Sequence, residues 1–324
     1  MARLLSAMIL MSACAPARPD TDGPVHGTVL TSWQPDQYRD PSTRKTLRRL
    51  VDIGINHVSV LTTWYQSSIW DHDIAPVASR TPQDHGLLYA LGEAKDLGLV
   101  TAVKPHLDLP DATWRGEIQP ADEAAWFAAY TAFIVHYAEL AEEADADWLV
   151  VGTELKGTER SDRWRDVFAA VREVYSGKLT YASNWDSFSA VTWWDEVDVI
   201  GVDAYFPLTS TFEPDPAALR GAWERLHGQL DTFAEAEGRP VVLTEVGYQD
   251  RDGANTSPWW APTDRKDAEE QLHCLDAMLG TLPAGEHVGG AYLWKTFFDP
   301  ARDEDGFDVI HKPAEAVVGR AWAR

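Results

Sequence analysis

The sequence predicts an α/β protein that folds as a single (β/α)8 TIM barrel. Short apolar segments alternate with longer amphipathic segments from residue 25 onward, and eight such pairs follow one another. This alternation is typical of a parallel sheet whose strands are joined by helices, and eight units favour a closed barrel over an open, doubly wound sheet. The chain has 324 residues, of which 45% are hydrophobic. This length suits one barrel, for which about 250 residues is typical.

The eight predicted strands are short runs of apolar residues. The fourth and the seventh are rich in Val and Leu and end in a glutamate, which is typical of a strand that is buried on both faces and whose last side chain emerges at the rim. In chain order, the strands are expected at residues 25–30, 57–61, 99–105, 148–154, 179–183, 197–202, 241–245 and 288–294.

The predicted helices carry apolar side chains at helical spacing. In the first helix Leu47, Leu50 and Val51 share one face, and the second helix is stopped by Gly98. The helices are expected at residues 42–52, 84–97, 121–143, 161–175, 216–237, 264–279 and 312–323, and a short helical segment near residues 191–195 follows the fifth strand.

The first residues are typical of an export signal. Residues 1–13 contain one arginine, a short apolar stretch and small residues just before Cys14. This pattern resembles a bacterial lipoprotein signal peptide, in which the cysteine is lipidated and becomes the mature N-terminus; an ordinary cleaved signal is the alternative. The apolar run is too short to span a bilayer as a mature helix. Residues 14–24, rich in Pro, Ala and Asp, are then a flexible tether, and residues 25–324 form the barrel.

An N-terminal lipid predicts a location outside the cytoplasm, at the cell envelope or the cell surface. The lipid anchor is the only membrane contact that we expect. Cys274 is the only other cysteine, so no intramolecular disulfide is expected once Cys14 is acylated.

The charge balance is strongly acidic. The chain has 51 Asp and Glu against 28 Lys and Arg, which gives a formal net charge of -23. Because such a surface repels nucleic acid and anionic membranes, neither is an expected partner and neutral substrates are favoured. The simplest interpretation of the charge is a solvated surface that keeps a secreted protein soluble.

Two glutamates stand at the carboxyl ends of predicted strands. Glu154 ends the fourth strand and Glu245 ends the seventh. In a parallel barrel these ends open into one mouth, where the chemistry of such barrels takes place, so the two acids suggest a catalytic carboxylate pair. The plainer interpretation of Glu154 is a strand-end acid that pairs with a neighbouring lysine such as Lys156.

Most other residues just past the predicted strands are aromatic, acidic or amide-bearing. Flat indole faces stack on the apolar faces of sugar rings, while carboxylates and amides bind hydroxyl groups. The set therefore favours a neutral carbohydrate as the ligand. It includes Trp33, Trp64, Tyr65, Gln66, His106, Asp108, Asn184, Trp185, Asp186, Asp203, Tyr205 and Trp294.

A carboxyl pair meets the needs of glycoside hydrolysis. One carboxylic acid protonates the leaving oxygen, and the other either attacks the anomeric carbon or activates a water molecule. A separation of about 5–5.5 Å would indicate a retaining enzyme. The sequence does not fix this distance, so it leaves the stereochemistry open.

Several motifs together resemble the clan A retaining glycoside hydrolases and, within that clan, glycoside hydrolase family one hundred and thirteen, the β-mannanase family. The resemblance runs from about residue 27 to residue 318. Its carriers are LTSWQPDQY, TTWYQ, KPHLDL, WRGEI, VVGTEL, SNWD, IGVDAYFPL, LTEVGY and YLWKTF. It implies a neutral β-linked polysaccharide or oligosaccharide as the substrate, with endo-β-1,4-mannanase activity by double displacement.

The resemblance also implies catalytic roles, with Glu154 as the acid/base and Glu245 as the nucleophile. Many clan members have Asn before the acid/base, whereas Thr153 stands there in this chain. A threonine hydroxyl can still bond to a sugar 2-hydroxyl.

Further residues are candidates for binding the substrate. Tyr205 is expected to hydrogen-bond the nucleophile, and Trp294 to lie under the sugar at the cleavage point; a core tyrosine and a packed tryptophan are the structural alternatives. The other candidates are Asn184, Trp185, His106, Trp64, Gln66, Lys104 and Trp114, while Trp259 and Trp260 form an outer subsite or clamp their loop.

Three other functions are weighed against this one. A metal-dependent barrel hydrolase would need clustered histidines, but the ten histidines are scattered and only His106 falls at a predicted strand end, so we expect neither a metal nor a cofactor. A glycan-binding surface lipoprotein that has lost its activity would not need both glutamates. A clan A enzyme acting on glucan or xylan stays open, because mannose and glucose differ only in the position of one hydroxyl.

Overall fold

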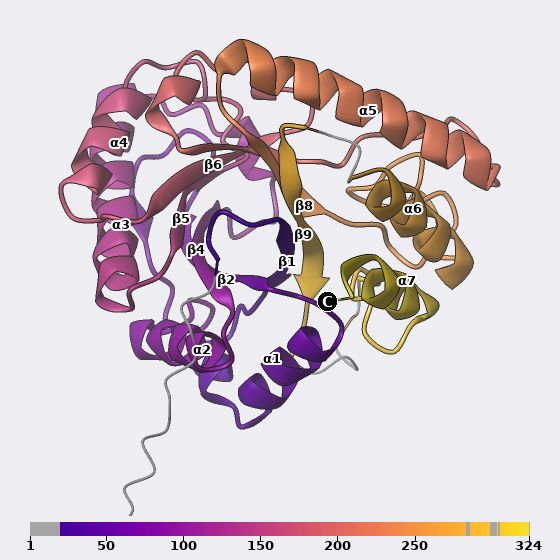
Figure 1. Cartoon of the computed structure of the whole chain (residues 1–324). Coiled ribbons are helices and arrows are strands. Elements are labelled where there is room, and N and C mark those ends of the chain that lie inside the picture. Colours follow the sequence, from indigo (N-terminus) through magenta and orange to yellow (C-terminus); the bar gives the residue numbers. More distant parts are fainter. Residues whose placement is uncertain (1–19, 283–285, 299–302, 304, 324) are drawn as a thin grey trace, which may run out of the picture.

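The computed structural model describes residues 20–323 with the exception of 283–285, 299–302 and 304. Within this part of the chain, parallel strands form a closed barrel with helices around its outside (Figure 1). The barrel strands are β1 (Val25–Leu30), β2 (His57–Gln66), β4 (Val100–Asp108), β5 (Trp148–Thr153), β6 (Lys178–Asn184), β7 (Val199–Asp203), β8 (Val241–Val246) and β9 (Val288–Thr296).

The barrel closes where the first strand meets its neighbours on both sides. β1 pairs in parallel with β2 and with β9, and the remaining neighbours follow in the order β9, β8, β7, β6, β5, β4 and β2. The predicted TIM barrel is therefore confirmed, and all eight strands point their carboxyl ends toward one mouth. A short strand, β3 (Ile74–Ala75), pairs antiparallel with the end of β2.

The helices lie between successive strands and cover the outside of the barrel. They are α1 (Ser42–Asp52), α2 (Asp84–Asp96), α3 (Glu123–Glu143), α4 (Trp164–Arg172), α5 (Pro216–Glu237), α6 (Ala268–Thr281) and α7 (Pro313–Trp322). In the part of the chain that the structure describes, no helix is both long enough and apolar enough to cross a membrane.

The strands separate two hydrophobic cores, because successive side chains of a strand point to opposite faces. In β8, Val242 belongs to a small cluster that also holds Val25, Leu61 and Trp148. Its neighbours Val241 and Leu243 belong to the large cluster that includes side chains of the surrounding helices. The small cluster fills part of the barrel interior, so the functional side chains are confined to its mouth.

Most elements lie where the sequence predicts them, and the differences concern their ends. β2 and β4 run on to Gln66 and Asp108, so His106 lies within β4 and not past its end. The helix predicted from residue 264 begins at Ala268, because the Asp267 side chain caps it. The short helical segment predicted near residues 191–195 takes the form of two 3-10 helices: η3 (Phe188–Ala190) lies just before this range, and η4 (Trp194–Glu196) overlaps its end.

The N-terminal segments fall mostly outside the described residues. The predicted signal peptide at residues 1–13, Cys14 and the tether up to residue 19 belong to this part. Of the tether residues that are described, Asp22 forms an ion pair with Lys178 at the start of β6. The other cysteine, Cys274, is buried and free.

Two glycines at helix ends give a matched test of packing against backbone strain. Gly54 and Gly98 follow α1 and α2 with φ values of 91° and 77°. A Cβ atom at Gly54 would lie 2.1 Å from the Trp322 carbonyl oxygen, whereas one at Gly98 would meet no atom within 4 Å. We therefore expect Gly98→Ala to lower the free energy of unfolding by about 1 kcal/mol, because of strain alone. Gly54→Ala should cost clearly more, because α7 must move.

Thermal and denaturant unfolding followed by circular dichroism would measure both variants beside the unaltered protein. Equal losses of stability would show that the contact between Gly54 and α7 does not matter.

Candidate active site

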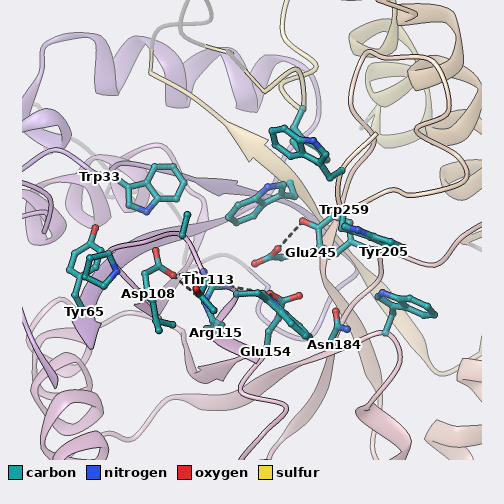
Figure 2. A pocket seen from close by; sticks show the side chains of 18 of the residues that line it. Trp33, Tyr65, Asp108, Thr113, Arg115, Glu154, Asn184, Tyr205, Glu245 and Trp259 are labelled. Atoms are coloured by element: carbon teal, nitrogen blue, oxygen red, sulfur yellow. Dashed lines mark hydrogen bonds and ion pairs between the residues drawn. The ribbon is translucent and has the colours of Figure 1, made fainter. Parts of the chain in front are cut away.

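A cavity of about 870 Å³ opens at the carboxyl ends of the barrel strands. Figure 2 shows Glu154 and Glu245 facing the same space, one directly after β5 and the other in β8. The lining is rich in aromatic side chains. It consists of Trp33, Tyr65, Arg80, Asp108, Leu109, Pro110, Ala112, Thr113, Trp114, Arg115, Glu154, Asn184, Trp185, Asp186, Tyr205, Glu245, Trp259, Trp260, Trp294 and Phe307.

Glu245, in β8, is buried and contacts a lysine and a tyrosine hydroxyl. Its Oε2 accepts a hydrogen bond of 2.8 Å from the Tyr205 hydroxyl. Its Oε1 lies 3.0 Å from Lys104 Nζ, in an ion pair that is almost completely buried. Because a cation and a hydroxyl donor both stabilise the carboxylate, Glu245 is suited to act as a nucleophile.

Lys104 also faces a second acid below the cavity. Its Nζ lies 3.6 Å from Asp203 Oδ1, which accepts a hydrogen bond from Thr244 Oγ1 at 2.8 Å. Burial raises the pKa of Asp203 well above its usual range, and the nearby charge of Glu245 raises it further. Lys104 thus lies between two buried carboxyl groups, and its Nζ is nearer to Glu245 than to Asp203.

Glu154 follows β5 directly and adopts a positive φ of 51°. Its Oε2 accepts hydrogen bonds from Trp114 Nε1 at 2.9 Å and from Arg115 Nη1 at 3.1 Å. Burial raises the pKa of Glu154; Arg115 opposes this rise and the charge of Glu245 adds to it. A carboxyl group that keeps its proton at higher pH is suited to act as a general acid.

Arg115 contacts the surroundings of both glutamates. Besides Glu154, its guanidinium donates to Asp108 Oδ1 at 2.5 Å and to His106 Nδ1 at 3.0 Å. Since a guanidinium only donates, His106 Nδ1 is the acceptor and the proton of the neutral ring sits on Nε2. That Nε2 lies 3.6 Å from Glu245 Oε1. Burial lowers the pKa of His106 well below its usual range, and the charges of Arg115 and Lys104 lower it further.

Tryptophans line two sides of the cavity. Trp294, in β9, stacks on the His106 ring with a centroid distance of 6.0 Å and an interplanar angle of 8°. Trp185 stacks on Trp259 at 5.8 Å and 12°. Flat apolar faces held in this way can pack against sugar rings.

The structure brings most of the predicted site residues together. Those that line the cavity are Glu154, Glu245, Trp294, Tyr205, Asn184, Trp185 and Trp114. Lys104 and His106 do not line it, but lie buried beneath it against Glu245.

The structure does not bring Trp64 and Gln66 to the cavity. Trp64 packs against Phe133 of α3, and Gln66 accepts a hydrogen bond from Trp126 Nε1. Both point outward from β2, whereas Tyr65 between them lines the cavity, because successive side chains alternate between the two faces of a strand. Trp64 and Gln66 therefore lie on the outer face of β2, whereas a role in binding the substrate needs the inner face.

Arg115 is the main functional residue that the sequence did not single out. It lies in the WRGEI motif next to Trp114, but nothing in the sequence shows that its side chain turns back toward β4 and Glu154. Glu154 pairs with Arg115, while Lys156, its plainer candidate partner, binds Asp186 at 2.7 Å.

A group of three acids follows β8, and among the described residues it is the one cluster with metal-ligand spacing. Oxygens of Asp252, Asp267 and Glu270 lie within 4.8 Å of one another. Glu270 accepts hydrogen bonds from the backbone of Gly253 and Asn255, Asp267 caps α6, and Asp252 pairs with an arginine. These acids fix the loop that carries Trp259 and Trp260.

A TIM barrel with two buried glutamates in one tryptophan-lined cavity has the architecture of a glycoside hydrolase, and comparison with known proteins shows this class. Glycoside Hydrolase Family 113 matches residues 30–310, and the chain belongs to this family. Comparison with curated proteins gave no match.

Solved structures of the same family are similar over nearly the whole chain. The family 113 β-mannanase AaManA from Alicyclobacillus acidocaldarius, in complex with ManMIm, has a TM-score of 0.84 and 29% identity, and the match covers 93% of this chain and 97% of that one. A family 113 β-1,4-mannanase gives a TM-score of 0.84 at 25% identity over 93% and 100%. A family 5 mannosidase from Rhizomucor miehei, with a TM-score of 0.62 and 10% identity over 94% and 96%, shares the fold alone.

The hydrogen bond from Trp114 predicts a change in the titration of Glu154. Because this bond stabilises the carboxylate, Trp114→Phe should raise the pKa of Glu154 further. NMR titration of protein with carbon-13 in its glutamate side chains would measure the shift, with the Glu154 signal assigned by its absence in Glu154→Gln. Trp260→Phe is the matched control, since Trp260 lines the same cavity and its ring contacts Arg251. An unchanged or lowered pKa in Trp114→Phe would contradict the role of this bond.

Proposed function

We propose that the protein is a retaining endo-β-1,4-mannanase that cleaves mannan-type polysaccharides or oligosaccharides. The observation that carries the proposal is the contrast between two buried carboxyl groups in one cavity. Glu245 forms an ion pair with Lys104 and accepts a hydrogen bond from Tyr205, while burial raises the pKa of Glu154. A carboxylate paired with a cation, beside a carboxylic acid with a raised pKa, supplies the nucleophile and the acid of a double displacement. Mannan as the substrate is supported by the family 113 β-mannanases that the chain resembles.

In the first step, a carboxylate oxygen of Glu245 bonds to the anomeric carbon. The bond between that carbon and the leaving oxygen breaks, and the proton of Glu154 passes to this oxygen. In the second step Glu154, now ionised, takes a proton from water, whose oxygen displaces Glu245 from the sugar. Arg115 helps the first step, because it stabilises the carboxylate that Glu154 becomes when it gives up its proton.

The aromatic residues would hold the sugar between these acids. Trp294 is proposed as the platform under the sugar at the cleavage point, with His106 fixing the plane of its ring. Tyr205 is proposed to keep the nucleophile in position through its hydrogen bond. Asn184, whose amide donates to Asp186 at 2.7 Å, and Trp185 are proposed to contact neighbouring parts of the substrate.

Replacing the two glutamates tests both roles. Glu154→Gln should fold normally and lower kcat on β-mannan by about 10²- to 10⁴-fold, because general acid catalysis contributes this much. The loss should be smaller on aryl glycosides, whose leaving group needs no proton. Glu245→Ala should abolish activity on both kinds of substrate, because it removes the nucleophile. Release of reducing sugar from β-mannan, glucomannan, cellulose and xylan would measure the effects and the preferred glycan.

Glu224→Gln, at an exposed position of α5, is the matched control and should keep full activity. Proton NMR of the first product formed would test the stereochemistry, since double displacement releases the β-anomer first. Full activity of Glu154→Gln on mannan would contradict the acid/base role, and initial release of the α-anomer would contradict the retaining mechanism.

We further propose that the protein is an extracytoplasmic lipoprotein, anchored through Cys14. The proposal rests on the sequence of residues 1–13 and on the following cysteine. Expressed at full length in a bacterium supplied with labelled palmitate, the unaltered protein should carry the label and fractionate with membranes, and Cys14→Ala should do neither. Cys274→Ala, which changes a buried cysteine, is the matched control and should stay labelled. Label on Cys14→Ala, or none on the unaltered protein, would contradict the lipid anchor.

A further inference from the structure

A second cavity, of about 590 Å³, adjoins the active-site cavity at the same end of the barrel. The two cavities share Trp114 and Asp186 in their linings. The loops that follow β2, β4, β5 and β6 line the second cavity, and they all leave the carboxyl ends of their strands. The mouth of the barrel therefore continues past Trp114 into a further depression.

The second cavity carries a large apolar side chain that packing within the protein does not explain. The Trp70 side chain is 56% exposed, and we find no other ring stacked on it among the described residues. Its backbone is nevertheless fixed, since its carbonyl accepts a hydrogen bond from Ala121 N at 2.9 Å and the preceding Ile69 carbonyl accepts one from Gln119 N at 2.9 Å. Because its loop is already held in place, this exposed indole loses little conformational entropy when a ligand binds to it.

The rest of this cavity supplies polar groups and the edge of the active site. Gln119 and the ion pair between Lys156 and Asp186, whose charged atoms lie 2.7 Å apart, can bind hydroxyl groups. The Trp114 ring lies against its own loop, where a Cβ atom at Gly116 would come within 2.4 Å of it. Only glycine leaves room for this packing, so the backbone holds the indole between the two cavities.

The position of the acid decides which end of the substrate would reach the second cavity. Trp114 lines this cavity and donates to Glu154. A general acid must lie beside the leaving oxygen, so the leaving part of the chain extends on the side of Glu154. A sugar chain that continues past Trp114 is therefore the aglycone, the part released first.

We propose that the second cavity is an aglycone-binding region for further units of a β-linked, neutral polysaccharide, with Trp70 as its stacking platform. The proposal rests on the proposed function, because Glu154 as the acid sets the direction of the chain. An indole face and hydroxyl-binding groups suit uncharged sugar units. The second cavity thus favours long substrates over di- and trisaccharides.

Trp70→Ala tests this region through the dependence of hydrolysis on chain length. We expect kcat/KM for a mannohexaose to fall about tenfold, while kcat/KM for a mannotriose stays nearly the same, because only the longer chain reaches Trp70. Trp70→Tyr, which keeps a flat ring, should recover much of the loss. Tyr89→Ala is the matched control, because Tyr89 is 39% exposed on α2 and lines neither cavity. Its removal should leave kcat/KM unchanged for both oligosaccharides.

A binding measurement separates this proposal from the proposed function. In the Glu245→Ala background, calorimetry should show weaker binding of the hexaose when Trp70 is also replaced by Ala, and unchanged binding of the triose. Equal losses for both lengths, or no loss for either, would overturn the aglycone region. If the unaltered protein hydrolyses neither oligosaccharide, the proposed function fails, and the binding comparison still decides whether Trp70 contacts a sugar chain.

Discussion

The buried guanidinium of Arg115 is the interaction on which the rest of the active site depends. A charge of this kind is costly to bury unless it is paired and hydrogen-bonded. Here Asp108, Glu154 and His106 all accept from it, and the Leu107 carbonyl accepts from its Nε at 3.2 Å. One side chain thereby joins β4 to the residue that follows β5. It also orients the neutral His106, which in turn lies against Glu245 and Trp294.

A second buried acid supports the backbone around Glu154. Glu159 accepts hydrogen bonds from the hydroxyls of Tyr181, Ser183 and Ser187. Burial raises its pKa to about 7, and these three hydroxyls oppose the rise. The Tyr181 oxygen also accepts a hydrogen bond from the backbone N–H of the residue after Glu154. This network holds the chain where Glu154 adopts its positive φ, so the direction of the acid side chain is set from below the cavity.

The sequence predicts the fold and the position of the two acids at the barrel mouth, because both follow from local patterns. An apolar run that ends in a glutamate shows where a buried strand reaches the rim, as at Glu154 and Glu245. Such a pattern does not show which side chains of a longer strand point into the barrel and which point outward. β2 extends beyond the predicted end, and Trp64 therefore packs against a helix while Tyr65 reaches the cavity.

Loop residues were harder to predict, because their direction depends on contacts between distant parts of the chain. Arg115 stands in a 3-10 helix, η2 (Arg115–Glu117), after β4, and its partners lie in β4 and directly after β5. Lys104 was expected to bind substrate, but its position within β4 makes it the buried counter-ion of Glu245. In both cases the residue type was visible in the sequence, and the partner was not.

Contacts of buried acids also explain part of the acidic composition. A net charge of -23 is accounted for only in part by a solvated surface, since several acids are buried and accept hydrogen bonds from loop backbone. Glu270 does so after β8, and Asp308 accepts from the N–H groups of Phe297 and Ile310 after β9. Carboxylates suit this task because they only accept hydrogen bonds, and loops leave N–H groups unpaired. Buried acids such as Glu270 and Asp308 thus fix loops at the mouth of the barrel, including the one that carries Trp259.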